Sequence, residues 1–149
     1  LVDIAIRLQT TCEPRGIFVQ DTPSDANPII RTIAMPADTN SSGDIFGGWL
    51  MSQMDLAAGS VAARVSKGRC ATVAVEGMKF LRPVHIGDEV TLYATLSGVG
   101  RTSMSIHVEA WRRQRHAEET EMVTSAEFTF VALDDEGRSR PVYPDQPDR

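Results

Sequence analysis

Asp55 lies where a carboxylate could take part in acid–base chemistry. It stands between Met54 and Leu56, inside a segment whose apolar residues recur at helical spacing, so we expect its side chain to be partly buried. A partly buried carboxylate can accept a proton from an attacking water molecule near neutral pH, or can itself attack as a nucleophile. On position alone, a solvated acid on the exposed side of a helix is the more common explanation.

Asn40 and the glycine pair Gly47-Gly48 could assist such a carboxylate. The side chain of Asn40 offers a donor and an acceptor, although an asparagine in the loop 39–43 ordinarily shapes a turn. Gly47 and Gly48 open the helical pattern, where the first backbone N–H groups have no partner and could stabilise an oxyanion. The simpler explanation is a turn into the helix, and we expect Asp44 to cap the helix or that turn.

A second set of polar residues could hold an anionic ligand. The run Arg101-Thr102-Ser103 begins a predicted strand and offers one guanidinium, two hydroxyls and free backbone groups. Three more cations are candidates for binding phosphate groups: Arg82, Lys79 and Arg64. For each of them a solvated surface charge is an equally ordinary explanation.

The remaining reactive residue types show no pattern of a metal or nucleophile site. His85, His107 and His116 are scattered without the spacing of metal ligands, so we expect no bound metal. The sequence lacks a serine nucleophile elbow and a phosphate-binding glycine loop. Cys12 and Cys70 suggest neither a disulfide framework nor a zinc knuckle, and we expect free thiols in a reducing compartment.

The bulk composition limits the class of protein. The 149 residues match one ordinary domain, and 42% hydrophobic with 23% charged residues are typical of a soluble globular chain. A net charge of -5 argues against a nucleic-acid surface, which would need a basic face. No apolar run is long enough to span a membrane, and the first residues lack the layout of a signal peptide. We therefore expect a cytoplasmic protein.

The hydrophobic periodicity predicts an α+β domain with one long helix. A β-branched run at 29–35 precedes a polar loop, and a helix at 47–66 is closed by Lys67 and by Gly68 as a left-handed cap. We expect a meander of four strands to follow, at 72–80, 89–97, 103–113 and 121–133. The domain would span 29–141, between a poorly patterned arm at 1–28 and a polar tail at 142–149.

The composition of the helix suggests how the elements pack. Many of its residues are glycine, alanine or serine, which let neighbouring backbone approach closely, so we expect the sheet to wrap around it. A single sheet around a single helix leaves one edge unpaired. Edge-to-edge pairing of two sheets would satisfy that edge, and this physical argument alone predicts a dimer.

One continuous stretch resembles a known family. The residues from Met35 to Asp55, MPADTNSSGDIFGGWLMSQMD, are similar to the signature of hotdog-fold acyl-CoA thioesterases of the YciA type, which are related to the brain acyl-CoA hydrolases. The resemblance continues through VEGMKFLRPV at 75–84 and GRTS at 100–103. It covers roughly residues 30–141, which is almost all of the patterned chain.

The resemblance implies a fold, an activity and an assembly. The fold is a single hotdog domain in which an antiparallel sheet wraps one central helix. The activity is hydrolysis of acyl-CoA to fatty acid and CoA, with no cofactor beyond the CoA of the substrate. Asp55 and Asn40 match the catalytic positions of the family, and the region of Arg101 to Ser103 lies near the pantetheine arm. Such enzymes have sites at a homodimer interface and usually form trimers of dimers, which are hexamers.

Two alternative functions remain open on the sequence. A hydratase or dehydratase of acyl thioesters would share the fold but would use a histidine with an acid, and no histidine occurs in the loop or in the helix. A non-catalytic acyl-CoA-binding module would need neither Asp55 nor Asn40. The acyl chain would pack against residues such as Trp49, Met51 and Met78, for which core packing is the ordinary explanation.

Overall fold

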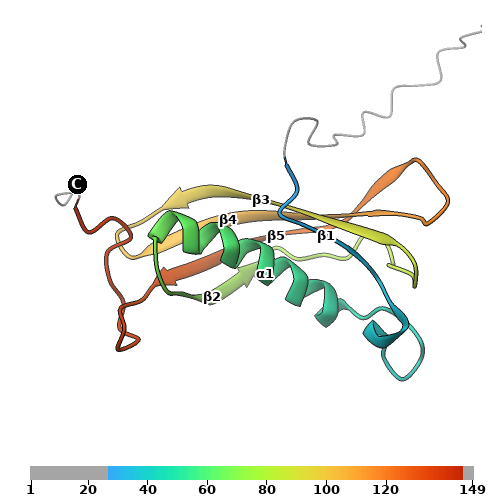
Figure 1. The fold of residues 1–149 in the computed structure, drawn as a ribbon, viewed down its shortest axis with the longest axis horizontal. Helices are drawn as coiled ribbons and strands as arrows, with labels where there is room; N and C mark the ends of the chain where they lie inside the picture. The colour runs from blue at the N-terminus through green and yellow to red at the C-terminus, as the bar shows by residue number, and fades with distance from the viewer. Residues whose placement is uncertain (1–26, 146–149) are drawn as a thin grey trace, which may run out of the picture.

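The computed structural model describes residues 27–145, which form one five-stranded antiparallel sheet and one long helix (Figure 1). A 3-10 turn, η1, links the first strand to the loop before the helix. The elements in chain order are β1 (Ile30–Ile33), η1 (Pro36–Asp38), α1 (Gly47–Ser66), β2 (Cys70–Glu76), β3 (Glu89–Val99), β4 (Ser103–Arg113) and β5 (Thr120–Ala132). The predicted arm at 1–28 lies outside the described residues except for its last two, and the predicted tail at 142–149 is described as far as Asp145. Val142 is nevertheless buried in the core, one residue past the predicted boundary.

The strand order corrects the predicted meander. The sheet runs β1-β3-β4-β5-β2, so only β3, β4 and β5 follow one another as a meander. β2 pairs with β5 at the far edge, since the chain crosses from the end of β2 to β3 through the loop 77–88. β2 also ends at Glu76, earlier than the predicted strand, because Gly77 turns the chain with a φ of 73° that side chains disfavour. Both edge strands are short.

The helix α1 lies across one face of the sheet and buries its small and apolar stripe there (Figure 1). Leu50, Met54, Ala57, Ala58 and Val61 are all buried, as their spacing predicts. They meet the inward residues of the strands, among them Leu92, Ile106, Val108, Phe128 and Phe130. The left-handed residue that ends the helix is Lys67, with a φ of 52°, and not Gly68 as predicted.

A β-bulge in β5 changes which side chains reach the core. Ala110 pairs with Thr124 and Trp111 pairs with Met122, so Val123 is an extra residue between them. Strict alternation predicts that Met122 points inward, but the bulge places Val123 there, only 1% exposed. A second bulge leaves Val73 unpaired in β2, between Thr72 and Ala74.

A buried guanidinium ties the loop 77–88 to the sheet. Arg112, whose side chain is 8% exposed, donates to Asp88 Oδ2 at 3.3 Å and to the main-chain oxygen of Pro83 at 2.7 Å. Its other nitrogens donate to Glu121 Oε2 at 3.1 and 2.8 Å, and this hydrogen bond lowers the pKa of Glu121 below its ordinary value. His85 Nδ1 lies 3.1 Å from the same guanidinium. The loop therefore has a fixed position although it contains no strand.

Replacement of Arg112 by methionine should strongly destabilise the fold. The substitution keeps much of the side-chain volume but leaves Asp88, 4% exposed, as a buried charge without its cation. Such a loss typically costs about 3–5 kcal/mol of unfolding free energy. Urea denaturation would measure the difference, with Arg115→Met on the exposed hairpin as the matched control. A change equal to that of the control would contradict the importance of the buried pair.

Candidate active site

Asp55 lies in the middle of α1 and faces the edge strand β2. Its carboxylate oxygen Oδ1 accepts a hydrogen bond of 2.5 Å from the hydroxyl of Thr72. Because Thr72 is paired with the inward residue Phe130, its side chain is directed to the helix side of the sheet. Asp55 is half-buried, as its position predicted. The hydroxyl fixes one oxygen and leaves Oδ2 to act on a substrate.

The charge of Asp55 acts on the thiol of Cys70. It is a free, half-buried thiol at the start of β2. Burial raises the pKa of the Cys70 thiol, Arg140 lowers it, and the negative field of Asp55 raises it further. The thiol is therefore held in its protonated form beside the carboxylate. It adds a small apolar neighbour to the site and no thiolate nucleophile.

Asn40 shapes its own loop, as the ordinary explanation predicted. Its side-chain oxygen Oδ1 accepts hydrogen bonds from the backbone N–H groups of Ser42 at 3.0 Å and of Asp44 at 3.1 Å. The main chain closes the same turn through Asn40 N to Asp44 O at 2.9 Å. These bonds hold the amide plane through its oxygen, so the side-chain nitrogen is the group that remains to donate. Asp44 does not cap α1, since the N-cap residue is Phe46 and no side chain bonds to it.

The start of α1 presents backbone donors beside an aromatic ring. The first intrahelical bonds are donated by Trp49 at 3.1 Å and Leu50 at 3.4 Å, both to Phe46 O, so the N–H groups of Gly47 and Gly48 precede them. The ring of Phe80 covers Gly47 so closely that a Cβ there would lie 2.9 Å from its Cζ atom. Glycine at this position allows the loop 77–88 to approach the helix start.

One chain does not bring these groups together. Gly48 and Asp55 are seven residues apart on one helix, which is about 10 Å along its axis. The hydrogen bonds of the Asn40 side chain and main chain all lie inside the loop that precedes this helix start. A single carbonyl group could not contact Asp55 and the helix start of the same protomer at hydrogen-bond distance.

The six predicted CoA-binding residues lie at two ends of the domain. Arg82 and Lys79 belong to the loop 77–88 near the helix start, where Arg82 donates to Met122 O at 3.0 Å and lies 3.5 Å from Glu121. Arg64 is in the last turn of α1. The turn at 101–103 lies at this same end, since Arg101 O accepts from Val142 and Thr102 O accepts from Ala132. Thr102 and Ser103 are half-buried.

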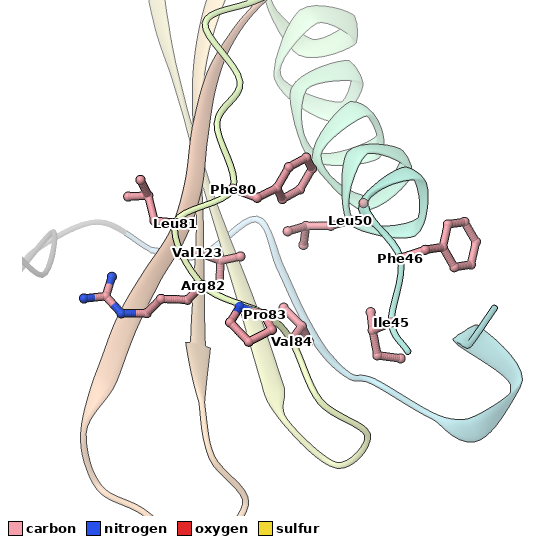
Figure 2. A pocket seen from close by; sticks show the side chains of 10 residues that line it. Ile45, Phe46, Leu50, Phe80, Leu81, Arg82, Pro83, Val84 and Val123 are labelled. Carbon is pink, nitrogen blue, oxygen red and sulfur yellow. The ribbon is translucent and has the colours of Figure 1, made fainter. Parts of the chain in front are cut away.

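Two cavities stand out in the described part of the chain, and neither contains Asp55 or Asn40. One, of about 330 Å³, lies between the helix start, the loop 77–88 and Val123 (Figure 2). The other, of about 620 Å³, lies at the end of α1 between Lys67, Arg69, Arg140 and the acids Asp134, Asp135 and Asp145. The apolar cavity is thus adjacent to the backbone donors of Gly47 and Gly48, and the larger one is lined by charges of both signs.

The histidines and possible metal ligands lie away from Asp55. His107 contacts Glu127 at 3.2 Å and Glu109 at 3.5 Å on the polar outer face of the sheet, as its alternation predicted. His85 contacts Arg112 and Asp88 in the loop 77–88. Within residues 27–145 no group of three His, Cys, Asp or Glu side chains is positioned to hold a metal ion. In that same range no helix has the length and apolar character needed to cross a membrane.

Comparison with known proteins decides the family. The sequence pattern of the Thioesterase superfamily matches residues 42–119, which is more than half of the chain. The chain belongs to this superfamily. The acyl-CoA thioester hydrolase YciA of Escherichia coli is 50% identical over 115 residues, covering 75% of this chain and 87% of the relative.

Solved structures of thioesterases share the fold. A hexameric broad-specificity acyl-coenzyme A thioesterase aligns with a TM-score of 0.76 and 47% sequence identity. The alignment covers 80% of this chain and 83% of the thioesterase chain. The same thioesterase has also been solved with one aspartate replaced by alanine. An acyl-CoA hydrolase of Staphylococcus aureus aligns with a TM-score of 0.70 and 28% sequence identity. The alignment covers 75% of this chain and 67% of the hydrolase chain, which was solved with coenzyme A and with one asparagine replaced by alanine. The described domain therefore has the predicted α+β hotdog fold.

Thr72 is a residue of the site that its sequence position did not single out. We expect Thr72→Val to lower kcat about ten- to a hundredfold, since a lost hydrogen bond to a charged group is worth about 1.5–3 kcal/mol and would free the Asp55 carboxylate to rotate. Thr72→Ser keeps the hydroxyl and should keep most of the activity. Steady-state kinetics of both variants with one acyl-CoA would test this. Equal activity of the two variants would contradict a positioning role for the hydroxyl.

Proposed function

We propose that the protein hydrolyses acyl-CoA thioesters to a free acid and CoA, at a site that two protomers share. The observation that carries the proposal is the half-buried Asp55 carboxylate, held by Thr72 at 2.5 Å in a chain of the thioesterase superfamily. The similarity to an acyl-CoA thioester hydrolase, 50% identical over 115 residues, supports the same reaction.

In the proposed mechanism Asp55 is the general base. Its Oδ2 accepts a proton from a water molecule, and the water oxygen attacks the thioester carbonyl carbon. The C–S bond then breaks, CoA leaves as a thiolate that takes up the proton, and the free acid remains. Direct attack by the carboxylate would use the same residue in the same orientation. Thr72 engages only Oδ1, so the free Oδ2 would hold the water molecule in the first mechanism and attack the carbonyl carbon in the second.

Asn40 and Gly48 would stabilise the oxyanion. The Oδ1 atom of Asn40 is bonded to its own loop, which orients the side-chain nitrogen as a donor. The N–H group of Gly48, supported by the helix dipole, is a second donor. Gly48 lies about 10 Å along the helix from Asp55 of the same chain, and Asn40 belongs to the loop before that helix start. We therefore propose that these donors act with the carboxylate of the partner protomer.

Assembly, location and cofactors complete the proposal. We propose that a homodimer is the minimal active unit and that three dimers form a hexamer. The likeness to two solved thioesterases described as hexameric supports the hexamer. CoA would bind to charged and polar residues at both ends of the domain, which are Arg101, Arg82, Lys79, Arg64, Thr102 and Ser103. The reaction needs no cofactor, because Asp55, Asn40 and Gly48 supply the base and the oxyanion donors. The free thiol of Cys70 fits a cytoplasmic location.

Asp55→Ala should lower kcat by about a hundredfold or more, which is the contribution of a general base. Wild type and variant would be compared on acyl-CoAs from acetyl to palmitoyl, with circular dichroism to confirm the fold. Asp44→Ala is the matched control, since Asp44 bonds to the loop only through its main chain. Full activity of Asp55→Ala would mean that another residue is catalytic. If the wild type binds acyl-CoA but does not hydrolyse it, the protein is the non-catalytic acyl-CoA-binding module.

A mixture of two inactive variants would test the shared site. If Asn40 of one protomer acts with Asp55 of the other, a dimer of one Asn40→Ala and one Asp55→Ala chain keeps one intact site. Random pairing after joint refolding should then restore about a quarter of the wild-type activity, because half of the symmetric dimers are mixed and each has one working site. Each variant refolded alone gives the baseline. No recovery above the baseline would place both residues in the same chain.

A further inference from the structure

The apolar cavity at the helix start is built from three separate segments. Its lining comes from the beginning of α1, from the loop 77–88 and from the bulge of β5. Figure 2 shows the side chains of Phe80 on the loop and Leu50 on the helix directed into the space between these two segments, with Val123, Val84 and Ile45 below them in this view. Leu50 and Val123 are 2% and 1% exposed, so they close the inner end, whereas Phe80 is 49% exposed at the mouth.

The chemistry of the lining selects an apolar occupant. The cavity residues are hydrophobic except for Gly47 and Arg82, and the guanidinium of Arg82 is turned to Glu121 and Met122 O and away from the cavity centre (Figure 2). No charged group is therefore aimed into the space from the lining residues. A volume of about 330 Å³ falls within the range of about 300–1,000 Å³ that is usual for small-molecule pockets.

The position of the cavity connects it to the chemistry of the proposed function. Gly47 forms part of the lining, and the N–H groups of Gly47 and Gly48 are the donors to which an oxyanion would bind. A carbonyl group held there has its substituents within a few bonds of the Phe80 ring, which lies against Gly47. The charged cavity at the other end of α1 has no such connection.

We infer that this cavity receives the acyl chain, and that Val123 and Leu50 set the length that it accepts; the inference rests on the proposed function. Water occupies about 30 Å³ per molecule in the liquid, and a methylene group slightly less. A cavity of about 330 Å³ therefore has room for a linear chain of at most about eleven such groups. The substrate class is medium-chain acyl-CoA. Longer chains meet the closed inner end at Val123 and Leu50, so their additional methylene groups gain no further burial.

The bulge makes Val123 the sensitive position. It is the extra residue of β5, and its main-chain oxygen accepts a hydrogen bond of 2.8 Å from Leu81 N in the loop that forms the opposite wall. A larger side chain at 123 would fill the inner end of the cavity without touching Asp55, Asn40 or the Arg101 turn. The effect of such a change would fall on chain length and not on the catalytic groups.

The test is the chain-length profile of kcat/KM. For the wild type, kcat/KM should rise about fourfold per added methylene from butyryl to octanoyl and then level off, because burying one CH₂ is worth about 0.8 kcal/mol. Val123→Phe should lower the decanoyl-to-acetyl ratio of kcat/KM about tenfold or more. Phe80→Ala removes an exposed wall, should fold normally, and should lower the same ratio about fourfold. Ile86→Ala is the matched control, an exposed apolar residue of the same loop outside the cavity.

The outcomes separate this inference from the proposed function. If the wild type hydrolyses none of the acyl-CoAs, the proposed function fails. If the wild type and the variants hydrolyse acetyl-CoA equally but the decanoyl-to-acetyl ratio of both cavity variants stays within twofold of the control, the acyl chain binds elsewhere and this inference is overturned. If Val123→Phe does not fold, the ratio measured for Phe80→Ala decides.

Discussion

The burial of the Arg112 guanidinium is the constraint on which the functional end of the molecule depends. A cation with so little exposure must have all its donors bonded, and here its partners are Asp88, Glu121, Pro83 O and His85. Three of these four lie in the loop between β2 and β3. The loop is thereby held against the sheet, and its earlier residues carry Phe80 to the start of α1. Without this attachment neither the apolar cavity nor the covered helix start would have a defined shape.

The long helix imposes a second condition. A rigid helix keeps its first backbone donors and Asp55 at a separation that no side-chain rotation can close. A reaction that needs both therefore needs two helices, and a symmetric pair of protomers supplies them in duplicate. The contact between the half-buried Asp55 and the exposed Thr72 at an edge strand is consistent with this arrangement, because the edge is where a partner sheet would be added.

Much of the fold could be predicted from the sequence, because α1 and the strands β3, β4 and β5 follow regular periods. The position of β2 in the sheet could not be predicted, because a pattern of alternating residues indicates which side chains share a face of the sheet but not which strands pair with one another. The bulges at Val73 and Val123 also escaped prediction, because one extra residue shifts the alternation without any marker in the sequence. Asp55 and Asn40 were singled out by their motif, and their catalytic roles remain predictions. Thr72 and Arg112 were missed because hydrogen bonds between residues far apart in the chain leave no local signal.

The insertion of Val123 has a consequence for how the chain can vary. The sheet pairs Thr124 with Ala110 on one side of it and Met122 with Trp111 on the other, so these pairs do not require the intervening residue. Deletion of a single codon here would leave an ordinary ladder, at the cost of the main-chain bond from Leu81. Proteins descended from one gene can therefore differ in the wall of this cavity by having or lacking a residue at position 123, as well as by the type of residue there.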